Sequence, residues 1–341
     1  MSPQLDKHMQ DLPLVSAIIA TYNRAHIVCE AIESILQQTY KHIELIVVDD
    51  GSTDNTQDKL REYGDRIRVV YQENSGPAAA WNSGIKASQG EIIAFLGSDD
   101  IWLPTFVEQQ VSVLQRCDQS VPCCLANAVL SFGSGKRSGA FENALLNPPY
   151  EEGLWSNVTE ILTTRFVLFG QTVAIRRAAL NQSGYFDESL RYLEDYDLAL
   201  RLSLQSPWAF IREPLVVWRQ GTGDSDSLSQ AAGRDPVQVH RNLVRIHERF
   251  LSKLDIAAKR AGSRKRIIRK LSSDSANLRA AKLTTTSSRM AQITGKLLGR
   301  VHHYKYAILR RSPWFPKMKT VELSNKQAST EKWETITSAV P

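Results

Sequence analysis

Cysteine is scarce in this sequence, and its few copies are not arranged for structural cross-links. The spacing fits neither a disulfide framework nor a zinc site, because one cysteine lies in a predicted helix and two others are adjacent. We therefore expect buried or half-buried thiols in a reducing compartment. The four cysteines are Cys29, Cys117, Cys123 and Cys124.

Long apolar runs are absent as well. The best candidate, residues 161–175, is interrupted by Arg165 and Gln171, so it falls short of the roughly 18 apolar residues that a membrane-spanning helix needs. Residues 1–13 are polar, which does not fit a signal peptide, and we expect them to be flexible. We predict a cytoplasmic protein, which could still lie peripherally on the inner face of a membrane.

Glycine-rich phosphate-binding loops are also missing, although strands and helices alternate. Apolar runs at 14–20, 43–48, 67–71 and 91–96 predict buried strands, and segments with helical periodicity separate them. This order predicts an α/β fold with a Rossmann-like, mostly parallel sheet flanked by helices. The sequence ATYNR after the first strand replaces the Gly-x-Gly-x-x-Gly turn of a dinucleotide-binding domain, and no P-loop is present.

Polar and mostly acidic side chains follow three of the predicted strands. Ligands of parallel α/β sheets bind at the carboxyl ends of the strands, so these clusters should converge on one crevice. Acidic strand ends would repel a diphosphate unless a divalent cation lay between them, which predicts a metal-bridged nucleotide. The clusters are Thr21-Tyr22-Asn23, Asp49-Asp50 and Asp99-Asp100.

Three motifs, in this order, carry a resemblance to a known family. The TYNR loop at 21–24, the VVDDGSTD segment at 47–54 and the SDD segment at 98–100 resemble the nucleotide-sugar half of the family 2 glycosyltransferases, which have the GT-A fold. The resemblance covers residues 14 to about 220. It implies an inverting transferase that uses a nucleoside-diphosphate sugar, expected to be UDP-linked, together with Mg²⁺ or Mn²⁺.

The resemblance also implies roles for individual residues. By motif, Thr21 and Tyr22 line the pocket for the base, and Asp50 accepts a hydrogen bond from it. Asp99 would hold the ribose or the metal, and Asp100 the metal. The alternative for the first two residues is an ordinary polar loop.

A second acidic motif, EDYD, begins at Glu194. If a helix starts there, Asp195 shares an inward-facing stripe with the apolar residues three, four and seven positions later. Burial would raise the pKa of Asp195 and the positive end of the helix would lower it; a partly dehydrated carboxylate that stays ionised suits a general base. The resemblance implies that Asp195 deprotonates the acceptor hydroxyl. The alternative is a helix cap.

Three departures from the family pattern bear on the phosphates and the metal. Gly97 replaces an acid two residues before Asp99, Trp81 replaces an arginine, and the segment 217–223 lacks a histidine. We therefore expect a metal site that depends mainly on Asp100 and that either binds the metal more weakly or takes its last ligands from the diphosphate and water. The Gln-x-x-Arg-Trp motif of processive synthases is absent too, which predicts transfer of a single sugar.

One domain is predicted over residues 14–232, after the flexible N-terminus. Its nucleotide-sugar half covers 14–100 and its acceptor half 101–232. In the acceptor half we predict a helix from Trp102 to about Cys117. The stretch 133–150 is rich in glycine, serine, asparagine and proline, which predicts an acceptor-side loop.

The charge is distributed unevenly. Residues 233–341 contain 24 lysines and arginines against 7 acidic residues, a net charge of +17, whereas residues 1–232 carry −11. Asp274 is the single acidic residue between Lys259 and Arg311. We predict a basic helical extension over 233–312 and a polar tail over 313–341, flexible from Val321.

The basic region 259–311 suits an anionic membrane surface, where a lipid-linked acceptor would be reached. The alternative is that the helical extension packs on the catalytic domain and shows a solvated basic face. Nucleic acid is not expected, since no aromatic stacking platform or nucleic-acid-binding signature accompanies the charge.

The resulting hypothesis is a metal-dependent, inverting glycosyltransferase. It would act on a glycan or lipid-linked acceptor in the synthesis of cell-surface polysaccharide, glycolipid or glycan. A sugar-nucleotide nucleotidyltransferase is one alternative, but its basic, glycine-rich triphosphate loop is missing. A catalytically weak GT-A module that binds nucleotide or glycan without turnover is the other.

Overall fold

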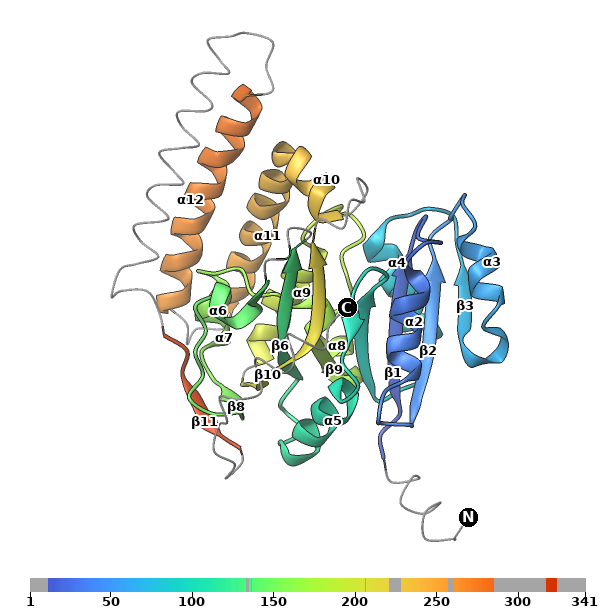
Figure 1. Ribbon diagram of the computed structural model, residues 1–341. Helices are drawn as coiled ribbons and strands as arrows, with labels where there is room; N and C mark the ends of the chain where they lie inside the picture. Colours follow the sequence, from blue (N-terminus) through green and yellow to red (C-terminus); the bar gives the residue numbers. More distant parts are fainter. Residues whose placement is uncertain are drawn as a thin grey trace.

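The computed structural model describes residues 12–132, 135, 137–205, 207–220, 228–256, 261–284 and 317–323. Within these ranges the strands form one 11-stranded mixed sheet with helices on both faces (Figure 1). The predicted α/β class is confirmed.

Four parallel strands form the nucleotide-sugar half of the sheet, in the order β3-β2-β1-β4. Alternate residues of the inner strands face opposite cores: Ile18 and Phe95 pack on one face, Ile19 and Leu96 on the other. Burial on both faces explains why these strands are continuous apolar runs in the sequence. Their bounds are β1 (Val15–Thr21), β2 (Ile43–Asp49), β3 (Arg68–Tyr71) and β4 (Ile92–Gly97).

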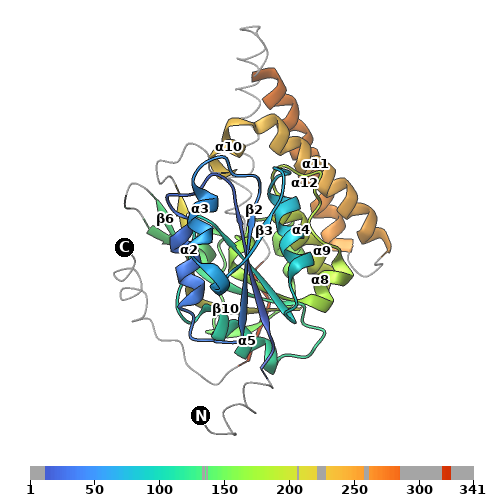
Figure 2. The same ribbon diagram turned by 90° about the vertical axis from the view of Figure 1, so that its right-hand side faces the viewer.

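Two sets of helices cover the faces (Figure 2). The first set is α2 (Val28–Leu36), α3 (Thr56–Arg61) and α5 (Phe106–Arg116). The second is α4 (Pro77–Ala87), α7 (Val158–Leu162), α8 (Arg177–Ser183) and α9 (Glu194–Leu202). The start of α4 is encoded locally, because Gly76 adopts a φ of 87° and proline is favoured in the first helical turn.

The acceptor half of the sheet is mixed. The long strands β6 and β10 are parallel, and β9 lies between β4 and β6, antiparallel to both. Short strands pair at the margins. The strands are β5 (Ile101–Trp102), β6 (Cys123–Phe132), β7 (Arg137–Gly139), β8 (Glu152–Trp155), β9 (Val173–Arg176), β10 (Trp208–Gln220) and β11 (Thr320–Glu322).

Two local predictions in this half are wrong. The helix predicted from Trp102 begins at Phe106, and Trp102 itself pairs with β10. Pro104 explains the late start, because a proline disfavours helical conformation at the residue before it. The predicted loop 133–150 contains β7 and the short helix α6 (Ala140–Asn143), since pairing with β6 outweighs the local turn signals.

The C-terminal part of the chain packs back against the sheet domain. Helices α10 (Leu228–Arg234), α11 (Pro236–Ile256) and α12 (Ala261–Thr284) follow the sheet. Ile246 and Phe250 of α11 join the core that contains α9. The flexible tail predicted from Val321 is wrong at β11, which pairs with β8 through backbone hydrogen bonds that do not depend on apolar side chains.

None of the described helices combines the length and the apolar character that crossing a membrane requires. Of the basic region 259–311, the structure describes residues 261–284, and the remainder lies outside the described residues.

Candidate functional site

The carboxyl ends of β1, β2 and β4 lie side by side. Thr21 is opposite Asp49 in the register of β1 and β2, and Ala20 is opposite Gly97 in that of β1 and β4. The amide of Asp50 donates to the Thr21 carbonyl at 2.9 Å. The structure therefore brings together the three polar clusters that the sequence places after these strands.

The loop after β1 offers a hydroxyl and a ring to a ligand. Thr21 is 3% exposed, and its Oγ1 has no hydrogen-bond partner within the described part of the chain. Tyr22 is 46% exposed. Asn23 fixes the loop, because its amide donates to Ser52 Oγ at 2.9 Å and its Oδ1 accepts from the Thr53 amide at 2.8 Å. Since a buried, unpaired hydroxyl is costly, Thr21 is suited to a ligand that supplies the missing partner.

Asp50 already accepts three hydrogen bonds from the protein. Its Oδ1 accepts from Gln72 Nε2 at 2.7 Å and from the Ser75 amide at 2.9 Å, and its Oδ2 accepts from the Gly76 amide at 2.9 Å. These bonds order the turn that begins α4. A nucleotide base could donate a hydrogen bond to this carboxylate only at Oδ2, which has accepted one hydrogen bond and can accept another.

Two carboxylates converge over Gly97. A Cβ atom at this position would lie 2.8 Å from Asp100 Oδ2 and 3.1 Å from Asp99 Oδ1. The glycine therefore provides space that both carboxylates use, and an acid at 97 would displace them. Burial, followed by the charge of Asp99, raises the pKa of Asp100 well above its usual range.

Two groups from the acceptor half fix the buried Asp100. Its Oδ2 accepts from Gln171 Nε2 at 3.0 Å, and its Oδ1 accepts from the Arg219 amide at 2.9 Å. Neither contact was predicted from the sequence. The available signal was that Gln171 interrupts an otherwise apolar run.

The carboxylate pair fits a divalent cation. Carboxylate oxygens are preferred ligands of Mg²⁺ and Mn²⁺, and a cation would relieve the repulsion that raises the pKa of Asp100. Among the described residues, no three or more histidine, cysteine or acidic side chains are grouped so that they could hold a metal ion by themselves. Asp99 and Asp100 would thus supply two protein ligands, and phosphate and water oxygens the others.

Helix α9 begins at Glu194, as predicted. The preceding Leu193 has a φ of 67°, a left-handed conformation that is uncommon for leucine and often found at functional sites. Leu198 and Leu202 are fully buried and Asp195 is half-buried, but Glu194 and Tyr196 are buried as well, so α9 is covered on more than the predicted stripe. Leu193 occupies the cap position, so Asp195 lies in the first turn.

Two opposing effects act on the pKa of Asp195, as expected. Burial raises its pKa, whereas hydrogen bonds that include those from the Tyr196 and Gly170 amides lower it. The Tyr196 amide lies 2.7 Å from Asp195 Oδ1. The neighbouring Glu194 is buried, and burial together with the charge of Asp195 raises the pKa of Glu194 to about 8.

A single turn, η2 (Gly170–Thr172), links the two carboxylate centres. The Gly170 amide faces Asp195, and the next residue, Gln171, binds Asp100. The turn is fixed in place because Trp102 Nε1 donates to the Gln171 carbonyl at 3.0 Å. Consecutive residues of one anchored turn therefore set the positions of both acids.

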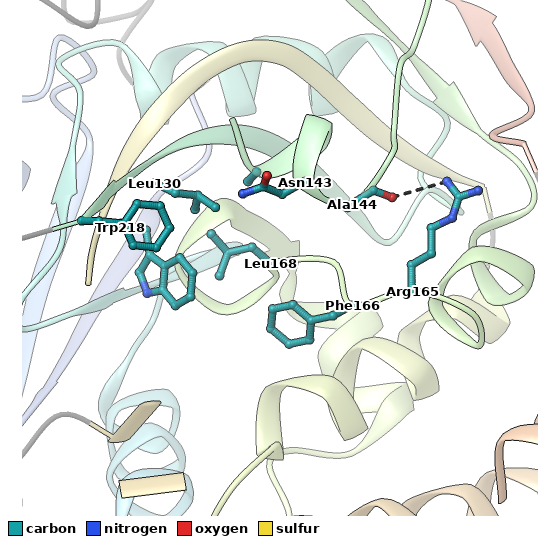
Figure 3. Close-up of a pocket in the computed structure, with 9 residues that line it drawn as sticks. Leu130, Asn143, Ala144, Arg165, Phe166, Leu168 and Trp218 are labelled. Carbon is teal, nitrogen blue, oxygen red and sulfur yellow. Dashed lines mark hydrogen bonds between the residues drawn. The ribbon is translucent and has the colours of Figure 1, made fainter. Parts of the chain in front are cut away.

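A pocket of about 380 Å³ is lined by residues that come shortly before this turn and before Arg219 in the chain (Figure 3). Leu168 precedes the turn by two residues, and Trp218 precedes the residue whose amide binds Asp100. Arg165 donates to the Leu145 carbonyl at 2.6 Å and so holds the loop beside the pocket. The lining residues, mostly apolar, are Leu130, Phe132, Ala140, Asn143, Ala144, Arg165, Phe166, Leu168 and Trp218.

Trp81, which replaces an arginine of the family pattern, is a packing residue. Its ring lies 5.3 Å from that of Phe95 in an edge-to-face arrangement. The adjacent Asn82 joins the two halves of the domain, because its side chain bonds to both the amide and the carbonyl of Phe186 at 3.0 Å. Residues 221–223 of the segment that lacks histidine lie outside the described residues.

Comparison with known proteins agrees with this geometry. Residues 16–186 match the family described as glycosyl transferase family 2. An uncharacterized glycosyltransferase of Rickettsia typhi is 37% identical over 205 residues, which is 60% of this chain and 63% of that protein. The glucosyltransferase WfgD of Escherichia coli is 45% identical over 105 residues, which is 30% of this chain and 42% of WfgD. The chain therefore spans less than two thirds of either relative.

Among solved structures, residues 1–349 of S. aureus TarS in complex with UDP-GlcNAc have a TM-score of 0.59 to this chain. The sequence identity is 16%, and the match covers 86% of this chain and 80% of the TarS chain. At this identity the likeness concerns the fold, and it confirms the predicted GT-A architecture.

Proposed function

Because the chain belongs to glycosyl transferase family 2, we propose that it transfers one sugar from a UDP-linked donor to an acceptor hydroxyl, with inversion at the anomeric carbon. The observation that carries the proposal is the turn Gly170–Thr172, which positions Asp100 and Asp195 together. UDP is favoured because WfgD is named for a UDP-Glc donor and TarS was solved with UDP-GlcNAc.

The donor would bind along the ends of β1, β2 and β4. The uracil would lie against Tyr22, with the unpaired Thr21 hydroxyl and the remaining capacity of Asp50 as its polar contacts. Asp99, which is half-buried beside the strand end, would contact the ribose or the metal. Asp100 and Asp99 would hold Mg²⁺ or Mn²⁺, whose charge would stabilise the departing diphosphate.

Asp195 would act as the general base. Its carboxylate would accept the proton of the acceptor hydroxyl while that oxygen attacks the anomeric carbon from the face opposite the diphosphate. Partial burial raises the pKa of Asp195 and makes it a better proton acceptor, while the amides of Gly170 and Tyr196 lower this pKa by stabilising the ionised form. A single displacement of this kind inverts the configuration.

The apolar pocket beside η2 is the proposed acceptor side. Aromatic and aliphatic side chains suit the apolar face of a sugar ring or a lipid chain. Phe166 is 53% exposed, so its ring is accessible to such an acceptor. The name of WfgD specifies an acceptor linked to diphosphoundecaprenol, so we propose a lipid-linked or cell-surface glycan acceptor for this chain. Such an acceptor would be met at the cytoplasmic face of a membrane, which the basic region 259–311 would contact.

The test compares wild-type protein with Asp195→Asn in calorimetry and in a mass-spectrometric transfer screen with UDP-sugars and Mn²⁺. Asp195→Asn should bind the donor like the wild type but transfer roughly 10²–10⁴ times more slowly. The exposed Asp65→Asn is the matched control and should keep full activity. Near wild-type transfer by Asp195→Asn would contradict the base assignment, whereas donor binding without turnover by the wild type would favour a binding module.

A further inference from the structure

A buried chain of polar side chains connects the catalytic helix to the C-terminal extension. The Tyr196 hydroxyl of α9 lies 2.9 Å from His247 Nε2 of α11, and His247 Nδ1 lies 2.8 Å from Asp274 Oδ2 of α12. Tyr196 and Asp274 are buried, and His247 is 0% exposed. The three helices lie on the same side of the sheet (Figure 2).

The contacts of Tyr196 indicate which atom donates the hydrogen bond between Tyr196 and His247. The Tyr196 hydroxyl donates to the Leu162 carbonyl at 3.1 Å, so His247 Nε2 must donate to the hydroxyl oxygen. Nδ1 lies at ion-pair distance from the Asp274 carboxylate. The carboxylate and the Tyr196 hydroxyl therefore contact the two ring nitrogens of His247. A buried ion pair is a poor source of stability by itself, so another role accounts for it better.

Helix α11 also holds the backbone and side chains on either side of Asp195. Asn242 Nδ2 donates to the Tyr192 carbonyl at 3.1 Å, just before the left-handed Leu193. Arg249 Nη2 donates to Asp197 Oδ1 at 2.9 Å. The start of α9 is therefore held from one neighbouring helix at residues 192, 196 and 197.

We propose that Tyr196, His247 and Asp274 are positioning residues for the general base, an inference that rests on the proposed role of Asp195. Tyr196 is bound at both ends: its backbone amide donates to Asp195 at 2.7 Å, and its hydroxyl is held by His247. Loss of the contact between the Tyr196 hydroxyl and His247 lets the first turn of α9 shift, which moves Asp195 relative to the donor. The extension thereby belongs to the catalytic apparatus.

The variants Tyr196→Phe and Asp274→Asn test this proposal in the full-length protein, because the first removes the hydroxyl that contacts His247, the second removes the negative charge beside His247, and both keep the side-chain volume. We expect kcat to fall roughly tenfold to hundredfold, as for a small misplacement of a catalytic group, while the KM for the donor changes less than twofold. The double variant should lose no more than the stronger single variant, since both act on one chain of contacts.

Ile246→Val is the matched control. It loosens the same core beside His247 without touching the polar chain, and it should keep wild-type kcat. Hydrogen exchange gives a readout that does not depend on transfer: the amides of residues 194–198 should exchange faster in Tyr196→Phe than in Ile246→Val.

The outcomes separate the two proposals. If Asp195→Asn abolishes transfer while Tyr196→Phe and Asp274→Asn keep wild-type kcat, the positioning role is overturned and the proposed function stands. If Asp195→Asn transfers normally, the base assignment fails. If the wild type transfers nothing, exchange at residues 194–198 decides the positioning role alone, and unchanged protection in Tyr196→Phe overturns it.

Discussion

Replacement of Gly97 by alanine is a direct perturbation of the carboxylate pair. The added Cβ would lie 2.8 Å from Asp100 Oδ2 and 3.1 Å from Asp99 Oδ1. Close carbon–oxygen contacts in proteins begin near ~3.3 Å, so Asp100 Oδ2 must retreat by roughly 0.5 Å. It cannot do so freely, because Gln171 Nε2 binds the same oxygen at 3.0 Å.

The expected loss follows from that hydrogen bond. A hydrogen bond to a charged group contributes about 1.5–3 kcal/mol, and every 1.4 kcal/mol is about tenfold in affinity. If the displaced carboxylate loses this support in the cation-bound state, Gly97→Ala should weaken Mn²⁺-dependent UDP binding about tenfold or more. Thermal stability should fall only modestly, since Asp99 is half-buried and can adjust.

Titration calorimetry of UDP in the presence of Mn²⁺ measures this loss. Gly233→Ala is the control, because no atom lies within 4 Å of its added Cβ and the substitution favours helix α10 by about 0.5–1 kcal/mol. Wild-type affinity in Gly97→Ala would refute the assignment of Asp99 and Asp100 as the cation site.

Three further predictions concern pH, the base pocket and the membrane. The raised pKa of Glu194, about 8, means that the native state holds a proton which the unfolded state has lost above about pH 4.5. Stability should therefore fall as the pH rises from about 5 to 8, and less so in Glu194→Gln; equal slopes in thermal melts would contradict this. Thr21→Val removes a buried, unpaired hydroxyl, so it should preserve the melting temperature yet weaken UDP binding; unchanged affinity in calorimetry would exclude Thr21 from the pocket. Full-length protein should co-sediment with anionic vesicles and be released by high salt, whereas equal binding to neutral vesicles would count against an electrostatic contact through 259–311.

The parallel half of the fold could be predicted because its signals are local. Strands buried on both faces read as unbroken apolar runs, and a carboxylate at the end of such a run, as at Asp49 or Asp100, stands out from the core pattern. The spacing at Asp195 was equally informative, since the periodicity of α9 places it beside buried leucines.

The supports of the site depend on tertiary contacts and could not be read in the same way. The amide of Arg219 contacts Asp100 although the two residues are 119 positions apart in the sequence. Weak signals existed: Gln171 interrupts an apolar run, and Asp274 is the single acid in a basic region. Both polar side chains contact buried partners. A sequence pattern can suggest that such a side chain is buried, but it cannot identify the residue that it contacts.

The strand β11 was missed for another reason. Its pairing with β8 joins Thr320 to Trp155 through the backbone, and backbone hydrogen bonds carry no side-chain signature. Prediction from polarity alone therefore assigned a flexible tail to residues that complete the edge of the sheet.

The most direct measurement of the central claim is the anomeric configuration of the product, followed by NMR during transfer from a UDP-α-sugar. A single displacement assisted by Asp195 predicts a β-linked product from the first turnover. An α-linked product would contradict the proposed mechanism. Retention of configuration does not result from a single displacement, which is the step that Asp195 would assist.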